Sequence, residues 1–253
     1  MSQHVVAVDI GNNTTHVGLI DTEKWSCLKR EEFPTAQAQN RLIAAIGRAA
    51  GDLPVRVAIS TVVKPLQARL DALLRKSTYA RPEWVGYHPD LAVKITYDKP
   101  QLLGADRIAN LLYAQAAFPG KSAIIIDSGT TINIECLKDG REFIGGAILP
   151  GAALQFKALH RGTSELPETA LDAPGADRPG TSTAACIRTG VLAGIAGALD
   201  RLVQSFKTQL SSECVVLATG GAWHAQEKLV TFGFQLVKDL TLIGVGVYGA
   251  TRK

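Results

Sequence analysis

The sequence is poor in the residues that build disulfide frameworks, metal centres and membrane spans. Its 253 residues include 4 cysteines, 5 histidines and 1 methionine. No cysteines form a C-x-x-C pair and the histidines show no ligand spacing, so we expect core-filling free thiols in a reducing compartment. No apolar stretch of about 18 residues lacks charge or turn residues, which predicts no transmembrane helix. No signal-peptide pattern opens the chain, so we expect a cytoplasmic protein without membrane contact.

Charge of one sign is not concentrated anywhere along the chain. The net charge is +4, with 46% hydrophobic and 20% charged residues. Lysine and arginine alternate with acidic residues and do not interleave with aromatic ones, which argues against a nucleic-acid partner. The composition is that of a globular protein with one large domain or two small ones.

One short pattern occurs twice: an apolar run followed by Asp-x-Gly and small polar residues. The first copy ends at Asp9–Gly11 and the second at Asp127–Gly129. An apolar run bounded by turn residues predicts a buried strand. The glycine permits a tight turn, the small polar residues offer donors to an anion such as phosphate, and the aspartate can hold a metal ion or its water shell. The repeat predicts two related α/β lobes around a phosphate-rich ligand.

The remaining pattern gives the order of elements and a boundary. Each half leads with strands and continues with helices, which predicts an α/β fold in two duplicated lobes, 1–118 and 119–253. The Gly145–Gly151 stretch and residues 161–181 are rich in turn residues and predict loops. The strands are expected at 4–10, 15–21, 55–60, 83–86, 92–95, about 122–127 and 214–218, and the helices near 38–51, 65–74, 104–118, 183–206 and from 241.

Two nucleotide-binding patterns occur in the wrong context. Gly244, Gly246 and Gly249 match G-x-G-x-x-G, but only four residues follow, which leaves no room for a βαβ unit. Small residues on a packed final helix explain them better. Gly120-Lys121-Ser122 resembles the end of a Walker A loop, but Gln115 stands where the first glycine belongs and a strand follows.

Gly104-Ala105-Asp106-Arg107 stands at the start of an expected helix. A helix N-terminus with an arginine suits an anionic substrate group, and an aspartate there can accept a proton from a hydroxyl. The same residues also suit a helix cap with a surface ion pair. The four residues alone leave both interpretations open.

Several motifs, in order along nearly the whole chain, resemble the type III pantothenate kinase family of the acetate and sugar kinase/Hsp70/actin superfamily. Besides the two Asp-x-Gly turns, they are Ser60–Pro65, Tyr97-Asp98-Lys99-Pro100, Gly104–Arg107, Gly145–Gly151, Ser182–Gly190, Thr219–Gly221 and Asp239–Leu242.

The resemblance implies two ribonuclease H-like (actin-like ATPase) lobes with the active site in the cleft between them. It implies ATP-dependent phosphorylation of pantothenate, the first step towards coenzyme A, with Mg²⁺ and K⁺ or NH₄⁺, in a homodimer. Asp106 would be the proton acceptor and Asp127 the ligand of the monovalent cation. Pantothenate would contact Tyr97, Gly104, Ala105, Asp106, Arg107 and Thr183. ATP would contact Asp9, Ile10, Gly11, Asn12, Asn13, Thr14, Thr15, His16 and Thr130.

The chain departs from the family pattern at a few positions. Asn13 replaces a threonine or serine, Ile132 and Asn133 stand where two threonines are usual, Glu135 replaces an aspartate and Ser182 an asparagine. Losing one hydroxyl donor reduces the binding free energy of the phosphate by about 1 kcal/mol, which is roughly a fivefold loss of affinity. Two other functions therefore stay open: a nucleotide-binding regulatory homologue without turnover, and a kinase of another small hydroxyl acid.

Overall fold

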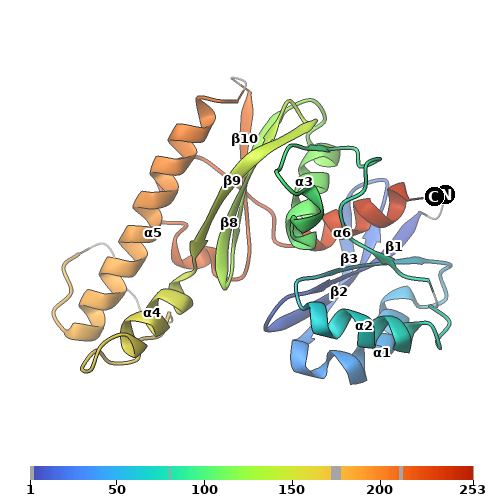
Figure 1. Ribbon diagram of the computed structural model, residues 1–253, viewed down its shortest axis with the longest axis horizontal. Helices are drawn as coiled ribbons and strands as arrows, with labels where there is room; N and C mark the ends of the chain where they lie inside the picture. The colour runs from blue at the N-terminus through green and yellow to red at the C-terminus, as the bar shows by residue number, and fades with distance from the viewer. Residues whose placement is uncertain (1–2, 80, 172–177, 211–212, 253) are drawn as a thin grey trace. The chain divides into compact units, whose positions relative to one another are not determined.

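A computed structural model describes residues 3–79, 81–171, 178–210 and 213–252. The chain forms two compact units (Figure 1). Unit 1 comprises residues 1–120, 140–144 and 239–253, and unit 2 comprises residues 121–139 and 145–238.

Unit 1 is a mixed five-stranded sheet with the order β3-β2-β1-β4-β5. β1 pairs antiparallel with β2 on one side and parallel with β4 on the other. The strands are β1 (His4–Ile10), β2 (Thr14–Asp21), β3 (Ser26–Pro34), β4 (Arg56–Thr61) and β5 (Glu83–Trp84). The helices are α1 (Ala38–Ala50), α2 (Lys64–Leu74), α3 (Ala105–Ala117) and α6 (Leu240–Thr251), with the 3₁₀ turns η1 (Thr35–Gln37) and η2 (Pro100–Leu102).

Helices cover both faces of this sheet, α1 and α2 on one and α3 and α6 on the other (Figure 1). Residues at alternate positions of β1, such as Val6 and Val8, join the core under α1 and α2. On the opposite face, an added Cβ on Gly249 of α6 would lie 3.0 Å from Val5. Both faces are buried, which explains why β1 is a nearly continuous apolar run.

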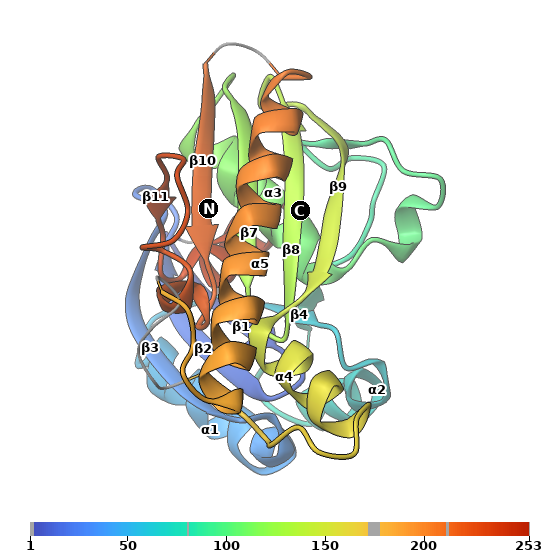
Figure 2. The same cartoon turned by 90° about the vertical axis from the view of Figure 1, so that its left-hand side faces the viewer.

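Unit 2 repeats this arrangement. β7 (Ser122–Ser128) pairs antiparallel with β8 (Thr131–Lys138) and parallel with β10 (Cys214–Thr219). The sheet has six strands in the order β11-β10-β7-β8-β9-β6, and without the edge strand β6 (Lys94–Ile95) this order matches that of unit 1 strand for strand. Figure 2 shows α5 running along this sheet. The other elements are β9 (Glu142–Pro150), β11 (Gln235–Leu236), α4 (Ala152–Arg161), α5 (Thr183–Lys207) and η3 (Trp223–Ala225). The expected duplicated α/β fold is confirmed.

Four expectations differ from the structure. Gly145–Pro150, expected as loop, belongs to β9, which starts in unit 1 by pairing with β6 (Lys94–Ile95). The mostly exposed β3 was not expected, because it carries charged residues in succession. Residues 239–253 were assigned to the second lobe, but α6 belongs to unit 1. All four thiols are free as expected, but only Cys136 is buried: Cys27 and Cys214 are partly exposed and Cys186 is exposed. Part of the expected 161–181 loop, residues 172–177, lies outside the described residues.

The glycines of α6 explain why it packs in unit 1. An added Cβ on Gly244 would overlap the backbone of Ala109 in α3, and one on Gly246 would lie 2.7 Å from Ile20. Only glycine allows this close helix-to-helix and helix-to-sheet approach. The G-x-G-x-x-G pattern is therefore a packing surface, as expected.

Candidate active site

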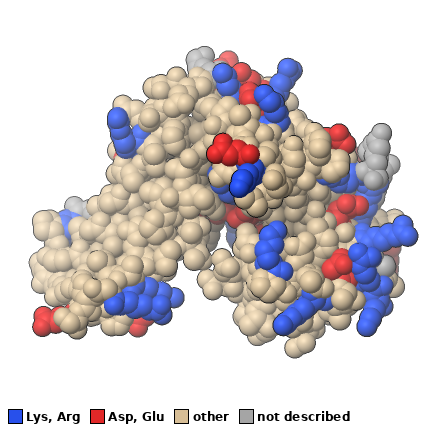
Figure 3. Space-filling view, in the orientation of Figure 1, with Lys and Arg blue, Asp and Glu red and all other residues tan. Residues whose placement is uncertain are grey.

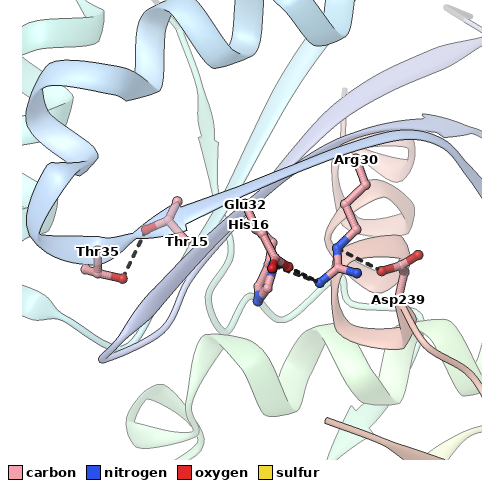
Figure 4. A network of polar contacts seen from close by, with 6 residues as sticks. All are labelled: Thr15, His16, Arg30, Glu32, Thr35 and Asp239. Carbon is pink, nitrogen blue, oxygen red and sulfur yellow. Dashed lines mark hydrogen bonds and ion pairs between the residues drawn. The ribbon is translucent and has the colours of Figure 1, made fainter. Parts of the chain in front are cut away.

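The first Asp-x-Gly turn lies at the end of β1 in unit 1, and its carbonyl groups are turned into the protein. Gly11 N donates to Thr14 O at 3.0 Å, and Thr35 Oγ1 donates to Gly11 O at 2.8 Å. Thr35 N also donates to Asn13 O at 2.9 Å, and its hydroxyl meets that of Thr15 at 3.1 Å (Figure 4). Asn12 and Asn13 are exposed. A turn whose acceptors are occupied and whose amide side chains face outward suits an anion.

The second turn, at the end of β7 in unit 2, is enclosed by two glycine segments. Gly151 N donates to Thr130 O at 3.0 Å, and Ala222 N donates to Ser128 O at 2.9 Å. An added Cβ on Gly151 would lie 2.7 Å from Thr130 O, and one on Gly220 would lie 2.6 Å from the Ser128 backbone. Gly151 is also the N-cap of α4, whose free N–H groups favour an anion nearby. The segments Gly145–Gly151 and Thr219–Gly221 thus shape this turn.

Three of the five departures from the family pattern have a defined place in the structure. Ile132 is fully buried, so a hydroxyl at this position would point into the core. Asn133 lies directly opposite Asp127 in the β7–β8 register and keeps both donor and acceptor atoms. Ser182 caps α5, with Oγ accepting from Ala185 N at 3.2 Å.

Asp106 stands in the first turn of α3 in unit 1. Its Oδ1 accepts from Arg107 N at 2.8 Å. Burial raises the pKa of Asp106, and the Arg107 N–H and guanidinium act in the opposite direction. An added Cβ on Gly104 would lie 2.5 Å from Asp106 Oδ1, so glycine leaves the space that this carboxylate occupies. A half-buried carboxylate whose pKa is raised is suited to accept a proton from a hydroxyl.

Arg107 is held beside Asp106 by an aromatic residue that sequence reasoning missed. The Arg107 side chain is buried, and the Arg107 Cζ lies 5.5 Å from the centre of the Phe143 ring. The Tyr97 ring lies 5.9 Å from the same ring. Phe143 is the second residue of β9 and is paired with Ile95 of β6. This pairing brings Tyr97 and Arg107, residues expected to bind substrate, to one aromatic ring.

The expected residues therefore form two groups. Unit 1 contains Tyr97, the Gly104–Arg107 motif and the Asp9–His16 turn, and unit 2 contains Asp127, Thr130 and Thr183. Thr183 is exposed and is the first residue of α5.

Comparison with known proteins gives the family. The profile described as type III pantothenate kinase matches residues 5–205. A type III pantothenate kinase of Dehalococcoides mccartyi is 34% identical over 98% of this chain and 97% of its own length. One of Kosmotoga olearia is 33% identical over 96% of this chain and 94% of its own. The chain belongs to the type III pantothenate kinase family.

Solved structures support the fold that this family membership implies. A Campylobacter jejuni protein described as a Baf family transcriptional activator superimposes with a TM-score of 0.62 at 18% identity, covering 95% of this chain and 94% of its own. A ROK family glucokinase from Streptomyces griseus, solved with glucose and AMPPNP, gives 0.54 at 11% identity over 98% and 100% of the two chains. At these identities the likeness concerns the fold alone.

A cavity in unit 1 lies outside the residues that the kinase family pattern marks. This cavity has a volume of about 700 Å³ and is lined by residues such as Leu91, Gln115 and Arg141. Gln115 is nine residues after Asp106 on α3, which places it about 14 Å further along the helix. Among the described residues, no cluster of three His, Cys, Asp or Glu side chains can hold a metal ion. In the same residues no helix is long and apolar enough to cross a membrane.

Proposed function

We propose that this protein phosphorylates pantothenate with ATP to give 4′-phosphopantothenate, the first step of coenzyme A biosynthesis. The main observation is that, in a chain of the type III pantothenate kinase family, the Gly-x-Asp-Arg aspartate is half-buried, has a raised pKa and stands beside a buried arginine. This arrangement favours catalysis over a surface helix cap, because neither Asp106 nor Arg107 is exposed.

Each substrate-binding side chain has a defined role in this proposal. Arg107 pairs with the carboxylate of pantothenate, because a guanidinium forms bidentate hydrogen bonds with that group. Tyr97, Gly104, Ala105 and Thr183 contact the rest of the substrate. Asp106 accepts the proton of the primary hydroxyl of pantothenate. The hydroxyl oxygen bonds to the γ-phosphorus of ATP as the bond between that phosphorus and the ADP oxygen breaks.

The two Asp-x-Gly turns bind the nucleotide in this proposal. Residues 9–16 and Thr130 supply N–H and side-chain donors to the phosphates. Mg²⁺ would be held mainly by the ATP phosphates and by its own waters. When bound, it neutralises charge on the phosphates.

A direct assay tests the proposed activity. ADP release with ATP, Mg²⁺, K⁺ and pantothenate should match the amount of 4′-phosphopantothenate found by mass spectrometry. Omitting pantothenate should abolish ADP release, and pantoate and glycerate, two other hydroxyl acids, should support it far less. No phosphopantothenate at any protein concentration would contradict the proposal, and a faster rate with another acid would redirect it.

Asp127 is proposed as the ligand of K⁺ or NH₄⁺. Asn133 and Thr219 lie opposite it in the strand register, so oxygen atoms from three neighbouring side chains share this strand end. Oxygen atoms are the ligands that hard cations take. We expect the phosphorylation rate to fall at least about tenfold when Na⁺ replaces K⁺ at equal ionic strength. Equal initial rates in both salts would remove this role from Asp127.

We also propose a homodimer in the cytoplasm. Ile148, Leu154 and Leu159 are exposed hydrophobic residues on β9 and α4 of unit 2, where a second copy can cover them. Light scattering on a sizing column should give about twice the chain mass of 26.9 kDa.

The lysine, arginine and acidic side chains visible in Figure 3 are interspersed, which gives no support to a nucleic-acid partner. No observation favours the regulatory alternative, since the likeness to the Baf protein concerns the fold.

A further inference from the structure

A chain of polar side chains in unit 1 runs from the start of α6 to His16 on β2 (Figure 4). Arg30 Nε lies 3.3 Å from Asp239 Oδ1, and Arg30 Nη2 donates to Glu32 Oε2 at 2.6 Å. The same Nη2 lies 3.2 Å from His16 Nδ1. The side chains of Arg30 and Asp239 are only 27% and 21% exposed. Arg30 is thus anchored by two carboxylates while it touches the imidazole.

The contact between Arg30 and His16 decides which ring nitrogen bears the proton. A guanidinium has only donors and stays protonated, so Nδ1 of His16 accepts. A neutral imidazole that accepts at Nδ1 carries its proton on Nε2. Glu32 Oε2 lies 3.6 Å from Nδ1 and would favour a proton there, but it is farther away than Arg30. Burial and the Arg30 charge also lower the pKa of His16, which favours the neutral ring.

His16 lies at the first phosphate turn. It is directly opposite Asp9 in the β1–β2 register, so both side chains point to the same face of the sheet. This is the face covered by α6, since an added Cβ on Gly18, two residues further along β2, would meet Leu242. The duplicated unit has the same feature, because Asn133 lies directly opposite Asp127. In both units a side chain with an N–H donor thus stands across from the turn aspartate.

We propose that Asp239 and Arg30 fix His16 as a neutral Nε2–H donor to a phosphate oxygen of the nucleotide at the first turn. This inference rests on the proposed function. It makes Arg30 and Asp239 positioning residues that act through His16, although neither belongs to the turn. A fixed donor suits a phosphate oxygen because hydrogen bonds to an ionised acceptor are about twice as strong as neutral ones.

The first test reads the tautomer without any catalysis. In the protein labelled with ¹⁵N-histidine and free of nucleotide, the His16 resonances should show a proton on Nε2 and none on Nδ1. Arg30→Met removes the donors and should give a mixture of tautomers or a protonated ring. Asp239→Asn keeps the shape but weakens the anchoring of Arg30, so the ring should stay neutral and show a smaller share of the Nδ1–H tautomer than Arg30→Met does. Arg48→Met is the matched control, because Arg48 pairs with Glu31, a different residue of β3.

The second test separates nucleotide positioning from folding. We expect Arg30→Met to raise the KM for ATP about three- to tenfold, with the KM for pantothenate changed less than twofold. His16→Phe should raise the KM for ATP about tenfold or more, and His16→Asn, which keeps an N–H donor, should recover part of the loss. The Tm of each variant, with and without ATP, shows whether the protein is folded.

Several results would overturn the proposal. The first is a proton on Nδ1 of His16 in the wild-type protein. The second is that both Arg30→Met and Asp239→Asn leave the His16 tautomer and the affinity for ATP unchanged. If Arg30→Met does not fold, the Asp239→Asn variant decides. A wild-type protein that binds ATP but does not phosphorylate pantothenate would contradict the proposed function alone, because the tautomer and ATP titrations followed by NMR need no turnover.

Discussion

Asp106→Asn should lower kcat by about 10²–10⁴-fold, the usual contribution of a positioned general base. Asparagine keeps the size of the side chain, and its Oδ1 can still accept from Arg107 N, the bond seen at 2.8 Å. It cannot accept the hydroxyl proton. ATP binding should therefore persist, because this residue does not belong to either phosphate turn.

The same sample separates catalysis from stability. Burial raises the pKa of Asp106, so the native state holds this proton more tightly than the unfolded chain and ionisation reduces stability as the pH rises. The neutral asparagine should leave the Tm at pH 7 unchanged or slightly higher. Asp52→Asn, at an exposed loop position, is the control and should change neither quantity. Near-normal kcat in Asp106→Asn would discard the base assignment.

The pH dependence of the wild-type enzyme gives an independent check. The base acts only when deprotonated, so kcat should fall as the pH drops through the pKa of Asp106. Because burial raises that pKa, the acid limb should lie above about 3.9, the ordinary value for aspartate. Asp106→Asn should lose this limb. A limb at or below the ordinary value would show that Asp106 does not control it.

The sequence predicted the elements whose pattern is local. β1 and β7 are apolar on both faces and end in Asp-x-Gly, so the run and the turn together define the strand and its boundary. The first turn of α3 was also predictable, since Gly104–Arg107 follows a proline-containing loop. The candidate residues 9–16, 106 and 107 follow from these local patterns, with their roles taken from the family resemblance.

The elements and residues that sequence analysis missed depend on distant partners. β3 is an edge strand with Lys29, Arg30, Glu31 and Glu32 in succession, so it lacks the alternation of a half-buried strand. Phe143 lies under Arg107 only because β9 pairs with β6. Arg30 and Asp239 meet only because α6 returns to unit 1. No spacing along the chain encodes these contacts.

Gly220→Ala should have the largest effect on unit 2. Gly220 has a φ of +96°, which L side chains rarely adopt, and an added Cβ would lie 2.6 Å from the Ser128 backbone. Overpacking costs about 1–3 kcal/mol, and a positive φ adds about 1–2 kcal/mol. The Tm should therefore fall by about 5–15 °C. Relief of the overlap moves Ser128 and the adjacent Gly129–Thr130 turn, so the KM for ATP should rise as well.

The neighbouring glycine provides the control for this prediction. An added Cβ on Gly221 meets nothing within 4 Å, so Gly221→Ala should keep the Tm within about 2 °C and leave the KM for ATP unchanged. Thermal unfolding and ATP-dependent kinetics on both variants measure the two effects side by side. If Gly220→Ala were as stable and as active as Gly221→Ala, the second turn would not depend on this close approach. Gly220 would then have no part in shaping the phosphate site, whereas a loss confined to Gly220→Ala ties that site to the backbone contact with Ser128.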